Sequence, residues 1–129
     1  MKRIILVVGN EFLPMDNKPI KLLPFLGKLF PEFHFLHFDP TEELPENIGD
    51  SLVCIDTVSG TTNVKCITSL QSFSQPPRNS VHDFDLYTQL SLLQKMGKLK
   101  KLFIIGVPQK GNFARIKKEI KEIFTSSGF

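Results

Sequence analysis

The sequence predicts an α/β protein: a three-layer α/β/α sandwich around a mostly parallel, mixed and twisted sheet. Two patterns favour this fold class. Short runs of aliphatic residues, such as 4–8 and 52–55, are apolar at every position, as strands covered on both faces require. Amphipathic helical repeats alternate with these runs along the chain, and this alternation is typical of a parallel sheet with helices on both faces.

Length and composition bound the class of protein. The chain has 129 residues, of which 41% are hydrophobic and 22% charged, so we expect one globular domain over residues 1–129. A formal charge of +3 is too small to indicate nucleic-acid binding. Only five apolar residues follow Lys2-Arg3 before Gly9, so we expect no signal peptide and a cytoplasmic protein. No apolar run approaches the roughly 20 residues that cross a bilayer, so we expect no membrane insertion. We also expect a monomer.

The first half of the chain alternates strands with one helix. Gly9-Asn10 should end the first strand, because both residues tolerate positive φ. Asn17 is expected to cap a helix that Pro24, which lacks an N–H group, kinks or shortens. The remaining elements are a strand over residues 33–38, an acidic exposed connection over 41–50, and a strand over 51–56.

The second half begins with a short edge strand within 64–70 and a polar loop over 71–81. A helical stripe follows and should stop at Gly97. A last strand over 102–107 precedes a final helix capped by Asn112. The residues expected to face inward are, in the first of these helices, Leu86, Leu90, Leu93 and Met96 and, in the second, Phe113, Ile116, Ile120 and Ile123.

Three polar residues stand where strands give way to loops or helices. Asp16 follows the first strand, Asp56 ends the third, and His82 immediately precedes a helix. At one sheet edge they would suit a divalent metal such as nickel, zinc or manganese, or act as general acid and base. Structural roles stay open: Asp16 as a helix cap, Asp56 as a turn-stabilising carboxylate, and His82 as a loop residue.

The remaining cysteines and histidines are interpreted as structural. Cys54 and Cys66 lie too far apart for a C-x-x-C motif, so we expect inert core thiols. His34 and His37 lie on one strand and are expected to be surface or core-edge residues. No G-x-S-x-G, H-E-x-x-H or phosphate-binding glycine motif is present in the sequence, which disfavours serine peptidases, zincins and nucleotide binding.

Four motifs in order support a family resemblance: V-V-G-N-x5-D (7–16), I-D (55–56), H-D-F-D-L (82–86) and I-I-G-V-P (104–108). Together they resemble the hydrogenase maturation proteases, and the overall pattern is most similar to short archaeal-type members. The resemblance implies a phosphorylase/hydrolase-like fold. It also implies an endopeptidase that removes the C-terminal extension of a nickel–iron hydrogenase large-subunit precursor, in an aspartyl-type, metal-binding mode.

The resemblance assigns Asp16, Asp56 and His82 as the catalytic and nickel-binding residues. Nickel would arrive with the nickel-loaded precursor, so no tightly bound metal of the enzyme's own is expected. Three segments differ from the family pattern and concern mainly the fit to the substrate: Met15-Asp16 replaces an acidic pair, Asn17-Lys18-Pro19 replaces glycines, and residues 39–43 replace a glycine-rich segment. Two alternatives stay open: an inactive member that binds the hydrogenase subunit as a chaperone, and a small flavodoxin-like ligand-binding module.

Overall fold

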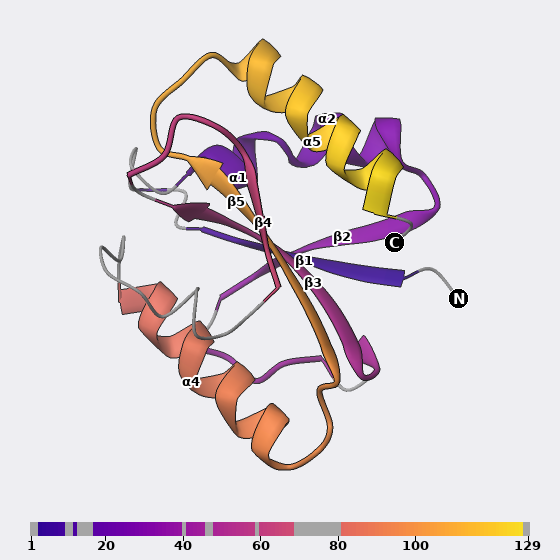
Figure 1. Ribbon diagram of the computed structural model, residues 1–129, viewed down its shortest axis with the longest axis vertical. Coiled ribbons are helices and arrows are strands. Elements are labelled where there is room, and N and C mark those ends of the chain that lie inside the picture. The colour runs from indigo at the N-terminus through magenta and orange to yellow at the C-terminus, as the bar shows by residue number, and fades with distance from the viewer. Residues whose placement is uncertain are drawn as a thin grey trace.

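The protein folds as the expected three-layer α/β/α sandwich. The computed structural model describes residues 3–9, 12, 17–39, 41–45, 48–58, 60–68 and 81–127, with only the backbone described for 81–85. A twisted sheet crosses the middle of the molecule, with three helices on one side and α4 on the other (Figure 1). The predicted alternation of buried strands and amphipathic helices is therefore confirmed.

The described part of the chain forms five strands and four helices. The sheet has the order β2-β1-β3-β5-β4, in which β4 is the antiparallel edge strand and the other four strands are parallel. The bounds are β1 Arg3–Val8, α1 Lys18–Lys21, α2 Leu23–Leu29, β2 Phe33–Phe38, β3 Ser51–Val58, β4 Lys65–Ile67, α4 Val81–Lys95, β5 Lys101–Pro108 and α5 Phe113–Ser127.

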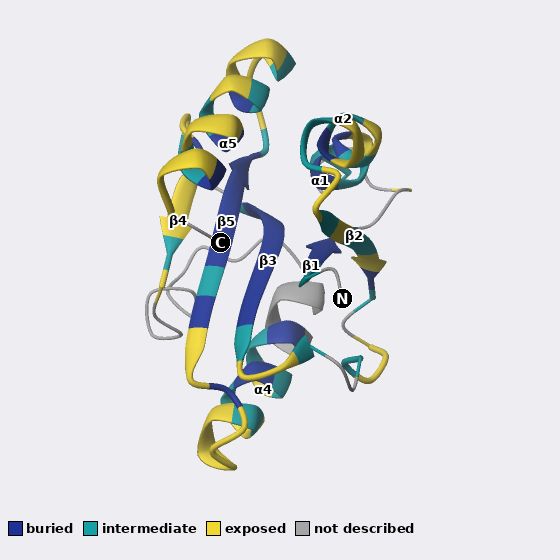
Figure 2. Ribbon diagram, turned by 90° about the vertical axis from the view of Figure 1, so that its right-hand side faces the viewer, coloured by how far each residue is buried: buried dark blue, intermediate teal, exposed yellow. Residues whose placement is uncertain are grey.

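Each buried strand contributes side chains to two hydrophobic cores, because successive side chains point to opposite faces of a sheet. We call the two faces the α5 face and the α4 face. On the α5 face, Ile5, Val53 and Ile105 pack against α1, α2 and α5. On the α4 face, alternate residues such as Leu6 and Cys54 pack against α4. Figure 2 shows the buried length of β3 and β5 between helices whose outer sides are exposed.

The predicted interruption of the first helix is confirmed. Leu22 separates α1 from α2, and its N–H group donates to the carbonyl oxygens of Lys18 and Pro19 at 3.1 and 3.2 Å. Pro24 lies in the first turn of α2, where its missing N–H costs no helical hydrogen bond. Asn17 holds the N-cap position, but its side chain makes no capping bond to α1. Pro19 removes one of the N–H groups that such a cap would use.

Two interpretations of the α4 side are wrong. The segment 41–50 is not simply an exposed connection, because Leu44 and Ile48 are half-buried and pack on the α4 face. Met96 is 53% exposed rather than inward-facing. It lies beyond the end of α4, and Gly97, with φ +73°, then turns the chain away. The predicted stop at Gly97 is confirmed.

The final helix follows the prediction closely. Asn112 Oδ1 accepts hydrogen bonds from the N–H groups of Ala114 (2.7 Å) and Arg115 (3.3 Å), as an N-cap does. Ile116, Ile120 and Phe124 form its buried stripe. In the part of the chain with assigned secondary structure, no helix is both long and apolar enough to cross a bilayer.

Candidate functional site

The candidate site lies where the four parallel strands end. Parallel strands share the direction in which they run, so β1, β2, β3 and β5 all finish at one side of the sheet, which we call the carboxyl edge. Ligands of open α/β sheets bind outside this edge. The last strand residues there are Val8, Phe38, Val58 and Pro108.

Asp56 lies inside β3 rather than at its end. The strand continues for two further residues to Val58, because its register with β5 persists as far as Val58 opposite Pro108. The interpretation of Asp56 as the strand terminus is therefore corrected. The side chain is 0% exposed, and Oδ1 accepts a hydrogen bond of 2.8 Å from the N–H of Thr57. A buried carboxylate is costly unless it is bonded, so its presence in a core strand is informative.

The face on which Asp56 lies follows from alternation along β3. Leu52 and Cys54 both belong to the core of the α4 face, so Asp56, two residues further, lies on that face as well. Its register partner in β5 is Gly106. A Cβ atom on Gly106 would come within 2.9 Å of both γ-carbons of Val58, so the absence of a side chain at this position lets the carboxyl ends of β3 and β5 pack closely.

Cys54 is a poor nucleophile. The thiol is fully buried, and burial raises its pKa far above the ordinary value, with the negative charge of Asp56 as a second cause. A thiol of raised pKa stays protonated near neutral pH, whereas the thiolate is the reactive form. The prediction of an inert core thiol is confirmed for Cys54 but wrong for Cys66, which is exposed on the edge strand β4.

Asp16 lies outside the described residues. Both sides of the loop that contains it are described, and each makes a contact at the carboxyl edge. Before the loop, the carbonyl oxygen of Gly9 lies 3.0 Å from His37 Nε2, which donates to it. After the loop, Lys18 Nζ lies 3.4 Å from the carbonyl oxygen of Gly111. The residues on either side of the loop therefore contact β2 and the segment between β5 and α5.

His82 lies in the first turn of α4, which begins at Val81, and not before the helix as the sequence suggested. Its side chain is outside the described part. The helix leads into β5 at the opposite end of the sheet, so its first turn lies toward the carboxyl edge. Further along the same helix, Leu86 and Leu90 are buried against the α4 face.

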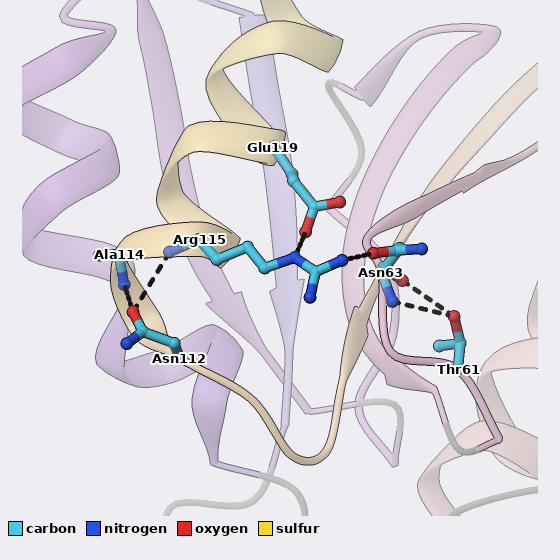
Figure 3. Close-up of polar contacts among 6 residues, drawn as sticks. All are labelled: Thr61, Asn63, Asn112, Ala114, Arg115 and Glu119. Carbon is cyan, nitrogen blue, oxygen red and sulfur yellow. Dashed lines mark hydrogen bonds and ion pairs between the residues drawn. The ribbon is translucent and has the colours of Figure 1, made fainter.

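A polar network connects the loop after β3 to α5 at the carboxyl edge, and no pattern in the sequence indicates it (Figure 3). Arg115 of α5 donates to Asn63 Oδ1 and forms an ion pair with Glu119, with 3.4 Å between Nε and Oε1. Thr61 Oγ1 donates to the carbonyl oxygen of Asn63 at 3.0 Å. The loop that follows β3 is thereby bound to the first turns of α5.

His37 was also missed as a residue of this edge. It was interpreted as a surface or core-edge position, and it is indeed exposed, but its ring also fixes the end of β1. The sequence feature that could have indicated this role is the position of His37 near the end of β2, the strand that pairs with β1. Among the side chains that the structure describes, which exclude Asp16 and His82, no group of three His, Cys, Asp or Glu residues is arranged to hold a metal ion.

Two solved structures of similar fold are named as endopeptidases. The chain is similar to hydrogenase maturating endopeptidase HybD from E. coli, with a TM-score of 0.70 and 20% sequence identity over 98% of this chain and 94% of that one. It is also similar to the solution structure of an endopeptidase from Escherichia coli, with a TM-score of 0.68 and 20% identity over 98% and 90%. No protein-family model and no curated protein matches the chain. At this identity the likeness establishes the fold: an α/β sandwich shared over nearly the whole chain.

Proposed function

We propose that the protein is an endopeptidase that removes the C-terminal extension of a nickel–iron hydrogenase large-subunit precursor after nickel insertion. The chain would be one hydrogenase maturation protease-like domain, acting as a cytoplasmic monomer. The observation that carries the proposal is Asp56, a fully buried carboxylate near the carboxyl edge. It occurs in a fold similar over 98% of this chain to a hydrogenase maturating endopeptidase.

Asp16, Asp56 and His82 are proposed to bind the nickel ion that the precursor carries. Two carboxylates and one imidazole provide oxygen and nitrogen donors that suit a divalent first-row metal, but they are too few to saturate it. The site is therefore completed only when the precursor brings its own ligands. This explains how an enzyme without a resident metal distinguishes loaded from unloaded precursor.

The proposed chemistry depends mainly on positioning. Holding the nickel at open coordination positions places the neighbouring peptide bond beside a water molecule, and good positioning lowers a barrier by several kcal/mol, up to roughly 7–11. A nickel ion would also polarise the peptide carbonyl or activate the water. Cys54 is not used, since burial keeps its thiol protonated. The water, rather than a side chain, would attack.

The test compares nickel-loaded and nickel-free precursor incubated with the purified protein. We expect mass spectrometry to find a shortened C-terminus only for the loaded precursor. If the loaded precursor binds and is never shortened, the protein is a chaperone instead. If FMN or a nucleotide raises the melting temperature and the precursor has no effect, it is a ligand-binding module.

Calorimetry with free Ni²⁺ tests where the metal comes from. A site of three donors that awaits further ligands from the substrate should bind free Ni²⁺ weakly. Tight stoichiometric binding of nickel or zinc to the protein alone would contradict a substrate-borne metal and indicate an ordinary metallohydrolase.

A further inference from the structure

A pocket opens at the carboxyl edge, beyond the ends of β3 and β5. It has a volume of about 320 Å³ and is lined by Gly60, Thr61, Thr62, Gln109 and Lys110. These residues belong to the segments that leave β3 and β5 at the carboxyl edge. β3 and β5 pair along their full length, so the two segments leave the sheet at neighbouring positions. The pocket between them lies just beyond the ends of these two strands.

The pocket is within reach of a peptide bound at the proposed nickel site. Gly60 is four residues after Asp56, and Lys110 is four residues after Gly106, the register partner of Asp56. An extended chain advances about 3.3 Å per residue, so the pocket begins at most about 13 Å from Asp56. A few residues of substrate on one side of the cut would span that distance.

The chemistry of the lining selects for a carboxylate. Two threonine hydroxyls and the Gln109 amide supply neutral hydrogen-bonding groups, and Lys110 is the charged residue among the described lining residues. A lysine ammonium offers three donors and no acceptor. A second cation lies close by, because Lys18 Nζ contacts the carbonyl oxygen of Gly111, the residue after Lys110. Both charges would attract an anionic group and repel a cationic one.

Hydrogen bonds and an ion pair hold the loop that contains Thr61, one wall of the pocket. Thr61 Oγ1 both donates to the carbonyl oxygen of Asn63 and accepts from its N–H group, at 3.0 and 3.3 Å. Arg115 then connects Asn63 to Glu119 on α5 (Figure 3). On the other side, Asn112 caps the same helix just after Lys110. One helix end therefore fixes both walls, and a fixed wall is what a specific subsite needs.

We propose that this pocket is a substrate subsite that binds a carboxylate of the peptide being processed, with Lys110 as its charge partner. The inference rests on the proposed endopeptidase function and adds a specificity-determining residue to it. The carboxylate has two possible sources in a C-terminal extension: an Asp or Glu side chain, or the terminal carboxylate itself.

Charge reversal at Lys110 tests the subsite. In Lys110→Glu we expect the KM for nickel-loaded precursor to rise roughly tenfold with kcat little changed, because the lost contact is with a part of the substrate remote from the cut. Lys98→Glu is the matched control: it reverses the charge of an exposed lysine near the amino end of β5 and should leave KM unchanged. An unchanged KM in Lys110→Glu, with the parent protein active, overturns the subsite and leaves the endopeptidase function standing.

Two altered precursors identify the source of the carboxylate. One has the acidic side chains of its extension changed to amides, and the other has an amidated C-terminus. The alteration that raises the KM of the parent protein and removes the effect of Lys110→Glu identifies the carboxylate that the pocket binds. If neither altered precursor changes KM, no carboxylate is recognised and the subsite is wrong.

A binding measurement separates the subsite from the catalytic proposal. A synthetic peptide of the extension is titrated into the parent protein, Lys110→Glu and Lys98→Glu by calorimetry. Weaker binding to Lys110→Glu alone supports the subsite even if no cleavage is found. Equal binding to all three, or no binding to the parent, overturns it.

Discussion

The two faces of the sheet are both buried but are built differently. On the α5 face, Phe124 packs against Phe30, Phe33 and Phe35, with ring centroids 4.8, 5.7 and 6.0 Å away. Alternation along β3 puts the buried but uncharged Thr57 on this face, next to its apolar core. The α4 face has a comparable aliphatic core, but near the carboxyl edge it includes the buried carboxylate of Asp56. A protein selected only for stability would gain by an apolar side chain there. The α5 face therefore serves mainly stability. The buried carboxylate of the α4 face supports the proposed site, because stability alone does not favour a charged group there.

The comparison predicts that the largest change in folding free energy comes from the aromatic cluster. Phe124→Ala should lower the free energy of unfolding by about 3–5 kcal/mol, since it leaves a cavity among three neighbouring rings. Urea unfolding measures the change. Met96→Ala, at a large apolar residue that is 53% exposed, is the control and should change stability by less than about 0.5 kcal/mol. Equal effects would contradict the assigned core.

The α4 face predicts a pH dependence that the α5 face lacks. Burial raises the pKa of the Cys54 thiol, so the folded protein keeps the proton that the unfolded chain loses above its ordinary value of about 8.5. Stability from this group is complete below that value and falls as pH rises, by about 1.4 kcal/mol per unit.

Between about pH 8 and pH 10 the parent protein should therefore lose about 2 kcal/mol more than Cys54→Ala, as measured by urea unfolding at each pH. Cys66→Ala is the control: burial also raises the pKa of the Cys66 thiol, but the residue is exposed, so the slope should change less than in Cys54→Ala. Identical slopes in the parent and Cys54→Ala would show that Cys54 ionises in the folded state.

The smallest effect is expected at the start of α5, where the α5 face meets the carboxyl edge. Asn112→Ala removes the acceptor for the N–H groups of Ala114 and Arg115 and should cost about 1 kcal/mol. Thermal unfolding measures the loss. Asn112→Ser, which retains a capping oxygen, should recover most of it. An unchanged melting temperature in Asn112→Ala would mean that water replaces the cap.

The sequence predicted the strands and the order of the layers because those depend on local pattern. Residues 33–38 form β2 as expected, and the first helix is interrupted at Leu22, two residues before Pro24. Patterns failed where tertiary contacts decide. Pairing with β5 extends β3 past Asp56. Helix α4 ends at Lys95, so Met96 is not part of its buried stripe. The half-buried Leu44 and Ile48 looked like parts of a polar connection, since no periodicity marks two apolar residues in a loop.

For the site, the sequence predicted which strand carries the carboxylate but not its surroundings. A charged residue at the end of an aliphatic run singles out Asp56, and its role in a site stays a prediction. The Arg115–Asn63 contact joins positions 52 residues apart, and the contact between His37 and Gly9 joins positions 28 apart. Neither partner has a distinctive local pattern, so only the folded chain shows these pairs.

Cleavage of the nickel-loaded precursor by single-site variants tests the central claim most directly. Asp16→Asn, Asp56→Asn and His82→Ala should each lower the rate roughly 10²–10⁴-fold. Asp39→Asn is the matched control: it also follows a strand at the carboxyl edge, and its side chain accepts bonds from Thr41 that an asparagine oxygen can still accept. The account predicts that only this control cuts at the parent rate. Parent-rate cleavage by all three site variants would contradict it.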